Sequence, residues 1–142
     1  MSETNEMAIA TINNIGAAPA GSMICSIKPD GDRKTAAKLY AAMNNPEFKL
    51  AEYINKKIKV TDYLIEIVDI VNEETGEVST VPRVVLIAED GKSYQATSYG
   101  IANSVRNLVQ AVGAAPWNPA LELEVQQRPT KRGSMLTLAL VG

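Results

Sequence analysis

Residues 57–97, KIKVTDYLIEIVDIVNEETGEVSTVPRVVLIAEDGKSYQAT, decide the fold of this 142-residue chain. Ile and Val alternate with polar residues over much of 57–71, which is the pattern of a long β-strand. Residues 81–88 predict a second, more continuously apolar strand, and residues 93–97 predict a third. The Asp90-Gly91 pair between them is typical of a two-residue hairpin, because both central positions of a type I′ turn need a positive φ. The stretch therefore predicts a three-stranded meander, the front half of several small barrels.

A helix and two further strands are predicted after the meander. Apolar residues recur at helical spacing over 99–112, with Ser98 as a candidate N-cap and Gly113 as the glycine that ends the helix. Residues 120–127 and 134–141 then alternate apolar with polar side chains. The order β-β-β-α-β-β is that of the OB-fold, a five-stranded, partly open Greek-key barrel. We therefore predict a mainly β, OB-fold-like barrel of five strands with an N-terminal helical extension.

The residues before the barrel are expected to form that extension. Ala, Gly, Ser, Asn and Pro dominate residues 1–31, which predicts a flexible arm with room for one short strand. The chain is interpreted as one OB-fold domain over 32–142, with helices in 32–55 and the barrel in 56–142.

Each of the two N-terminal helices is predicted to have an apolar face. Asp32 is a fair N-cap for the first helix, and Pro46 lies near the first turn of the second. The predicted packing residues are Ala36, Leu39, Tyr40 and Met43 in the first helix and Phe48, Leu50, Ala51 and Ile54 in the second.

Composition excludes several classes of function. The chain has no His and one Cys, Cys25, so the usual zinc ligand sets and the Ser-His-Asp or Cys-His nucleophile arrangements cannot be assembled. The Asp and Glu residues occupy polar positions of predicted strands and turns, which is typical of a solvated face. We expect no enzyme activity, no metal and no cofactor. The chain has no uninterrupted apolar run of about 18 residues and no basic leader, so we expect a soluble, cytoplasmic protein without a membrane partner.

Net charge argues in part against a nucleic-acid partner. The formal charge is −2 and the pI is near 5.2, whereas an overall basic surface is the usual electrostatic sign of such a partner. Binding depends on where the cations lie, however, because acidic side chains can be confined to one flank.

Single-stranded nucleic acid is held by aromatic faces on which bases stack and by cations along the backbone path. The sequence offers both kinds of residue, with Lys56 as a further cation. The candidate DNA-contacting residues are Lys57, Lys59, Tyr63, Arg83, Lys92, Tyr94, Tyr99, Arg106, Trp117, Arg128, Lys131 and Arg132. The other interpretation is that the aromatic residues pack in the core and the cations serve solubility.

Two loops and one tryptophan bear on whether the candidate residues contact DNA or only pack and solubilise the protein. Arg128, Lys131 and Arg132 fall in the predicted loop 128–133, which would flank the ligand groove of an OB-fold. The first hairpin loop, NEETGE, has three glutamates that would repel phosphate. Trp117, between two prolines, would either cap the barrel or offer a face to a base, and its stiff surroundings favour packing.

Several short motifs resemble those of the single-stranded DNA-binding proteins of tailed bacteriophages of gut and Gram-positive hosts. These are the NNP helix break, TGE, PR before the second strand, DGK followed by Tyr94, and PWNP after the helix, and the resemblance spans residues 39–141. It implies an OB-fold that coats single strands without sequence preference during phage replication or recombination. It also implies that Arg83, Lys92, Tyr94 and Trp117 match the family pattern. Expected partners are single-stranded DNA, replication or recombination proteins and, in a homo-oligomer, further copies of the chain. The sequence departs from the family pattern in its acidic NEETGE loop and in having no acidic tail after the last strand, so recruitment through such a tail is not expected.

The alternative is an OB-like protein-interaction or assembly module without nucleic acid, which the acidic pI favours. The two hypotheses differ in what one concave face should display. Cations and aromatic residues are expected there for DNA binding, and an exposed apolar patch for protein binding.

Overall fold

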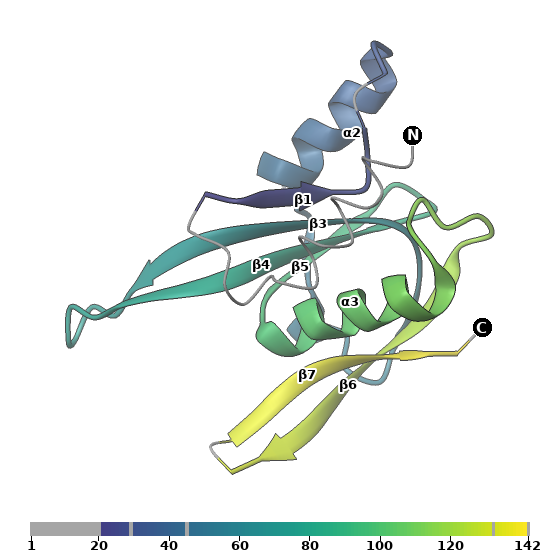
Figure 1. The fold of residues 1–142 in the computed structure, drawn as a ribbon. Coiled ribbons are helices and arrows are strands. Elements are labelled where there is room, and N and C mark those ends of the chain that lie inside the picture. Colours follow the sequence, from purple (N-terminus) through teal and green to yellow (C-terminus); the bar gives the residue numbers. More distant parts are fainter. Residues whose placement is uncertain (1–20, 29, 45, 132, 142) are drawn as a thin grey trace.

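The computed structural model describes residues 21–28, 30–44, 46–131 and 133–141. The predicted meander is confirmed as three antiparallel strands, β3 (Lys57–Val71), β4 (Val78–Ala88) and β5 (Ser93–Thr97). β4 begins three residues earlier than predicted. The mainly β, OB-like character of the fold is also confirmed (Figure 1).

The described residues form one sheet of seven strands rather than five. Its order is β2-β5-β4-β3-β6-β7, with β1 (Met23–Cys25) paired to β3 outside this path. β6 (Leu121–Thr130) and β7 (Gly133–Leu140) form the last hairpin, and the two-residue β2 (Phe48–Lys49) runs parallel to β5. The sheet curls into a half-barrel, but β5 and β7 are not paired with each other. The prediction of five strands is wrong because β1 and β2 are too short to leave a periodic pattern.

Helix α3 (Tyr99–Val112) lies in the bowl of the sheet, as predicted, between β5 and β6. The Ser98 hydroxyl accepts a hydrogen bond from the Ile101 amide at 3.2 Å, which satisfies a free helix N–H. The helix contacts β7 closely through Gly100, where a Cβ would collide with the Leu136 carbonyl oxygen. Further along, the Leu138 amide donates to Ser104 Oγ at 3.1 Å. α3 therefore holds the last hairpin in place.

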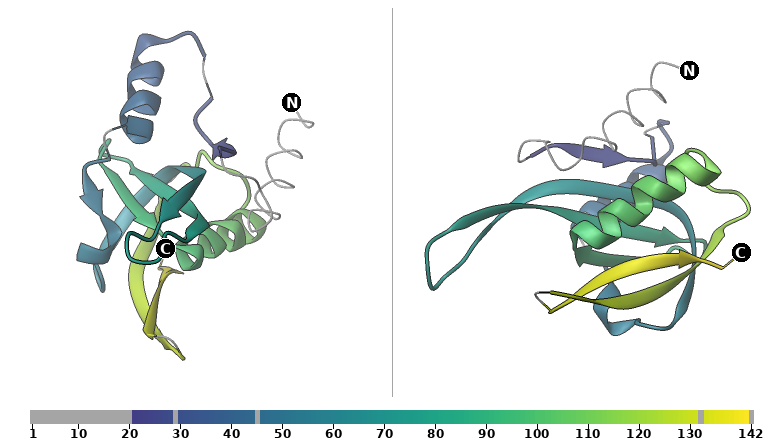
Figure 2. Two further views of the ribbon diagram at one scale, coloured as in Figure 1. Left: turned by 90° about the vertical axis from the view of Figure 1, so that its left-hand side faces the viewer. Right: turned by 60° about the horizontal axis from the view of Figure 1, so that its bottom comes forward.

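The N-terminal extension differs from its prediction in two ways. α2 (Arg33–Asn44) is a helix as predicted, and Asp32 accepts a hydrogen bond from the Lys34 amide at 2.8 Å as its cap. Its packing face is Leu39 and Ala42, however, while Ala36, Tyr40 and Met43 are exposed. The predicted face is wrong because the helix touches the sheet with one narrow stripe and otherwise stands free (Figure 2).

The second predicted helix is replaced by β2 and a 3-10 helix, Leu50–Glu52. Leu50 is fully buried, and Phe48 and Ile54 pack against the core, as predicted. Ala51 is exposed, contrary to its predicted packing role. The segment is extended at Phe48 because the edge of β5 offers backbone partners that a local helix would leave unpaired.

Two apolar clusters cover the two faces of the sheet, with α3 on one face and α2 on the other (Figure 2). A β-bulge between Val60 and Asp62 shifts the alternation of β3 by one residue. Beyond it, Tyr63 and Ile65 face the larger cluster with α3, while Leu64 faces the smaller cluster with α2.

Both long hairpins project from the barrel (Figure 1). β6 continues to Thr130, which pairs with Gly133, so the predicted loop 128–133 is too long. Arg128 is consequently a strand residue opposite Met135. Of the predicted arm, residues 1–20 and 29 lie outside the described residues, and residues 23–25 form β1.

Candidate nucleic-acid interface

Three aromatic side chains form a cluster at the β2–β5 edge. The Phe48 and Tyr94 rings are stacked with their centroids 5.3 Å apart, and Tyr53 meets the Tyr94 ring edge-on at 5.0 Å. Strand pairing creates the first contact, because Phe48 lies opposite Tyr94 in the ladder. Tyr94 is buried, but Phe48 and Tyr53 are only half-buried. We call these three residues the aromatic cluster.

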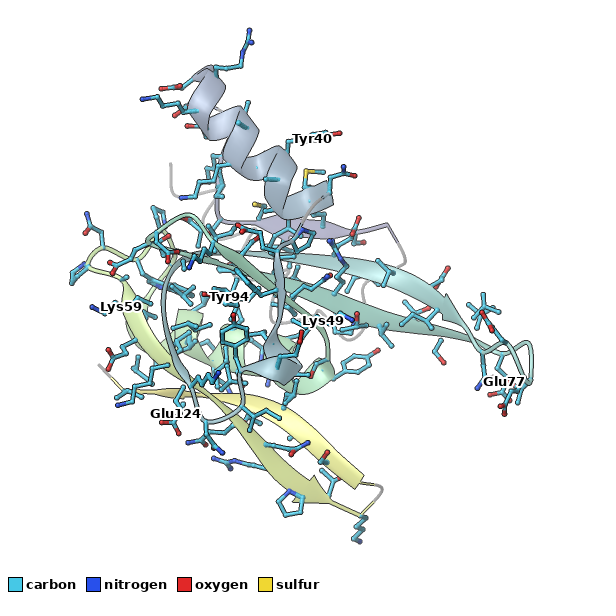
Figure 3. The ribbon with its side chains drawn as sticks, turned by 180° about the vertical axis from the view of Figure 1, so that it is seen from behind. Tyr40, Lys49, Lys59, Glu77, Tyr94 and Glu124 are labelled. Atoms are coloured by element: carbon cyan, nitrogen blue, oxygen red, sulfur yellow. The ribbon has the colours of Figure 1, made fainter. Side chains whose placement is uncertain are left out.

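Lysines surround the aromatic cluster. Lys56 Nζ lies 5.4 Å from the Tyr53 ring centroid and Lys92 Nζ lies 5.9 Å from that of Phe48. Lys49 follows Phe48 on β2 and shares the face shown in Figure 3 with Tyr94. Cations beside aromatic rings suit a strand whose bases stack while its phosphates are neutralised.

A cleft of about 360 Å³ adjoins the cluster where the half-barrel stays open. β2 pairs with β5 only at Tyr94 and Gln95, so Ala96 and Thr97 face Leu136 of β7 without a ladder between them. We call this opening the seam. Among the described residues its lining has no carboxylate, and it consists of Lys49, Ala51, Gln95, Ala96, Thr97 and Leu136. The lining is mostly apolar, with Lys49 as its one cation, so the opening suits a base or sugar at its apolar wall and a phosphate beside Lys49.

Burial keeps the Tyr94 hydroxyl protonated. It raises the pKa of the phenol, and the nearby Asp90 carboxylate, Tyr53 and Glu47 raise it further. At neutral pH the hydroxyl is therefore a neutral donor and acceptor.

Two candidate aromatic residues lie inside the protein. Tyr63 and Trp117 are each 4% exposed, and their rings pack 5.8 Å apart. The Trp117 indole donates to the Gly113 carbonyl at 2.9 Å. Packing, which the flanking prolines favour, is confirmed for Trp117. Neither ring has an open face for a base in this structure.

Arg83 and Tyr99 hold parts of the fold together. The Arg83 guanidinium lies 3.2 Å from a Glu66 carboxylate oxygen and donates to the Met43 carbonyl at 3.1 Å, so it ties the end of α2 to the sheet. Tyr99 is 45% exposed and donates its hydroxyl to the Thr80 carbonyl.

The remaining candidate cations are spread over several surfaces. Lys57 and Lys59 lie opposite Glu124 and Glu122 of β6, and Lys59 also lies 3.9 Å from Glu89. Arg106 is half-buried on α3. Arg128 and Lys131 are exposed on the β6–β7 hairpin, and Arg132 lies outside the described residues. The structure thus brings Lys92 and Tyr94 together at the aromatic cluster, whereas Lys57 and Lys59 each have an acidic residue opposite them on β6.

Three residues of the interface escaped the sequence analysis, namely Phe48, Lys49 and Tyr53. Their segment was expected to be helical, with Phe48 only as a packing residue; Phe48 does pack against the core, but it stays half-buried. The available signal was the sequence FKLAEYINKK, which interleaves aromatic with basic residues as single-strand binding requires.

The described residues offer neither a metal site nor a membrane-spanning helix. In the part of the chain that the structure describes, no three His, Cys, Asp or Glu side chains gather closely enough to hold a metal ion. None of the described helices is long and apolar enough to span a membrane.

An OB-like half-barrel with an aromatic cluster and lysines at its open edge defines a protein of the nucleic-acid-binding class. Comparison with known protein families shows which family within this class the chain belongs to. A family model described as phage single-stranded DNA-binding protein matches residues 22–141, which span the sheet from β1 to β7. The chain belongs to this family and is a single-stranded DNA-binding protein. No curated protein and no solved structure matches the chain.

Proposed function

We propose that the protein coats single-stranded DNA without sequence preference during phage replication or recombination, in the host cytoplasm. The strand is proposed to follow the open edge of the half-barrel, with bases against the aromatic cluster and phosphates near Lys49, Lys56 and Lys92. The observation that carries this proposal is the joint position of the cluster, its lysines and the carboxylate-free seam.

Stacking and charge contacts both tolerate any base, because every base has a π-face and every nucleotide has a phosphate. The β6–β7 hairpin extends the proposed path with Arg128 and Lys131. Tyr99 and Lys57 are proposed at its margins. Tyr63, Arg83 and Trp117 are left out of the proposed contacts because burial or ion pairing already engages them.

The interaction-module alternative predicted an apolar patch at the concave face. Exposed apolar side chains lie on the β3–β4 hairpin, at Ile70, Val71 and Val78. Others lie on β7, which borders the seam, at Met135 and Leu140. They are compatible with protein contacts in addition to DNA binding.

Fluorescence anisotropy with labelled oligonucleotides tests the proposal. We expect tight binding to oligothymidine and to mixed-sequence single strands, and much weaker binding to duplex. Lys49→Ala with Lys92→Ala should weaken binding to a short oligonucleotide. The matched loss of two cations in Arg33→Ala with Lys34→Ala, on the far side of the sheet, should not. If both double variants lose the same affinity for the oligonucleotide, the DNA strand does not follow the β2–β5 edge.

A further inference from the structure

The β3–β4 hairpin carries a concentrated negative charge. Residues 69–80 contain four carboxylates, from Asp69, Glu73, Glu74 and Glu77, and no cation. The turn that displays them is ordered, since Asn72 Oδ1 accepts hydrogen bonds from the amides of Glu74 and Thr75 at 2.9 and 3.2 Å. We call residues 69–80 the acidic arm. Its charge repels phosphate, so the arm must serve something other than the DNA backbone.

The acidic arm also exposes apolar side chains. Ile70, Val71 and Val78 are 45%, 58% and 61% exposed. Acidic and apolar groups together describe a surface that suits a basic and apolar partner rather than solvent alone.

Helix α2 has the complementary surface. Its sequence, RKTAAKLYAAMN, contains three cations and no carboxylate. The Asp30 and Asp32 side chains cap its first turn, and Lys38 is paired with Asp62 at 3.4 Å, so Arg33 and Lys34 supply the positive charge that is unpaired among the described residues. Arg33, Ala37 and Tyr40 recur at helical spacing on the side turned away from the sheet, with Lys34 beside them, and all are exposed. Tyr40 is 63% exposed. We call this side the outward face of α2.

The arm and the outward face of α2 belong to different sides of one molecule. The arm projects past the end of the sheet, whereas α2 stands above it (Figures 1 and 2). The arm and the outward face of α2 therefore do not touch within one molecule. The arm of one copy is free to touch the outward face of α2 of another copy. Such a head-to-tail contact propagates as a row when its rotation does not close a ring.

We propose that the acidic arm of one copy docks on the outward face of α2 of the next copy, so that protomers line up along single-stranded DNA. The proposal rests on the coating function proposed above. Charge complementarity supplies orientation, and the apolar groups Val71, Val78 and Tyr40 supply burial.

The test compares affinity per site for two oligothymidines, one just long enough for a single copy and one several times longer. The wild-type protein should bind the longer strand more tightly per site. Glu73→Lys with Glu74→Lys, and separately Arg33→Glu with Lys34→Glu, should each lower this long-to-short ratio about tenfold, because modest exposed ion pairs become repulsive. Circular dichroism should show that α2 is retained. Glu122→Lys with Glu124→Lys, which adds the same charge on β6, should leave the ratio unchanged.

The decisive measurement mixes the two reversed variants. Each repels itself, but an alternating row pairs opposite charges at every junction: a basic arm meets an acidic helix at one junction, and an acidic arm meets a basic helix at the next. The mixture should therefore recover the ratio. The quadruple variant should recover it as well. Unchanged ratios in the single variants, or no recovery in the mixture, would overturn the docking proposal. If Arg33→Glu with Lys34→Glu already lowers the affinity for the short strand, α2 contacts DNA rather than the acidic arm of a neighbouring copy. No binding of the short strand by the wild-type protein would overturn the proposed function, whereas binding with a ratio of one would overturn the docking alone.

Discussion

The aromatic residues of this protein differ in how far their side chains are exposed to solvent, and this difference separates those that stabilise the fold from those that can stack on a base. Tyr63 and Trp117 are buried against each other, whereas Phe48 and Tyr53 keep part of their rings open beside lysines. A ring with no open face stabilises the fold, and a ring with an open face beside a cation can receive a base. Single substitutions should therefore separate stability from affinity.

Trp117→Ala should lower the free energy of unfolding by about 3–5 kcal/mol, because it removes a buried ring and its hydrogen bond to Gly113. Urea denaturation measures the loss, and Tyr40→Ala, at an exposed site, serves as control. Single-stranded DNA should leave the tryptophan emission of the wild-type protein nearly unaltered. A strong quench together with an unchanged unfolding midpoint in the variant would contradict burial.

Tyr53→Leu should keep an apolar side chain against Phe48 and Tyr94 but remove the ring, its edge-on contacts and its stacking face. We expect a loss of about 1–3 kcal/mol in binding free energy for single-stranded DNA. Tyr40→Leu, which changes a tyrosine outside the cluster, should bind a short oligonucleotide like the wild type. If Tyr53→Leu also binds normally, bases do not stack at this ring.

Burial raises the pKa of Tyr63 from 10.0 to about 12, with a smaller contribution from Cys25. The unfolded chain releases this proton first, so the folded state loses stability as pH rises from about 10 to about 12, by at most ~1.4 kcal/mol per pH unit. Below pH 10 the contribution is constant. Denaturation at pH 9 and pH 11 should show a smaller loss in Tyr63→Phe than in the wild type. Equal losses would assign the alkaline sensitivity to other groups.

At the scale of elements, helix α3 sets the position of the last hairpin. Gly100 allows the helix backbone to touch β7, and Ser104 accepts the Leu138 amide. Arg83 performs a similar task for α2 through Glu66 and Met43. The hairpins and helices that carry charge are thus oriented by contacts distant from that charge.

Gly100→Ala tests the close contact between α3 and β7, because the direction of the change in melting temperature depends on that contact. Alanine in an ordinary helix is more favourable than glycine by about 1 kcal/mol. Here the added Cβ collides with the Leu136 carbonyl and the Met135 side chain, so we expect a lower melting temperature and a displaced β6–β7 hairpin. Asn107→Ala, on the exposed side of α3, should not destabilise the protein. A raised melting temperature for Gly100→Ala would mean that the hairpin does not press on the helix.

At the scale of the whole molecule, some charges are balanced locally, as in the Lys59–Glu89 ion pair, and others are separated. The formal charge is −2, yet carboxylates gather on the acidic arm while lysines flank the aromatic cluster. An acidic pI is therefore compatible with DNA binding, because phosphates meet the local cations.

The salt dependence of binding measures how many cations meet phosphate. Affinity for oligothymidine should fall linearly in log-log form, with a slope of about −0.7 per phosphate neutralised. If Arg128 and Lys131 each contact a phosphate, their joint replacement by alanine should flatten the slope by about 1.4. Arg33→Ala with Lys34→Ala should leave the slope of a short oligonucleotide unchanged. An unaltered slope in the first variant would remove the β6–β7 hairpin from the path.

Local patterns in the sequence were enough to predict the helices and strands whose apolar residues recur with a strong period. The alternation of 57–71 and the spacing of 99–112 with Ser98 predicted the meander and α3, because period and capping depend on neighbours along the chain. The Asp90-Gly91 pair marked the turn, but its predicted two-residue type I′ form is wrong: the connection is residues 89–92, and only Gly91 of the pair has a positive φ. The family motifs likewise pointed to single-stranded DNA.

Only the tertiary structure determined which residues meet across the open edge. Phe48 and Lys49 form a strand because the edge of β5 presents unpaired backbone groups, and their partners Tyr94 and Gln95 lie far along the chain. Burial of Trp117 and exposure of Tyr40 likewise depend on how much surface other elements cover. Strand pairing and coverage are long-range properties that a local period does not contain, and for this reason the aromatic cluster and the seam appeared only in the folded protein.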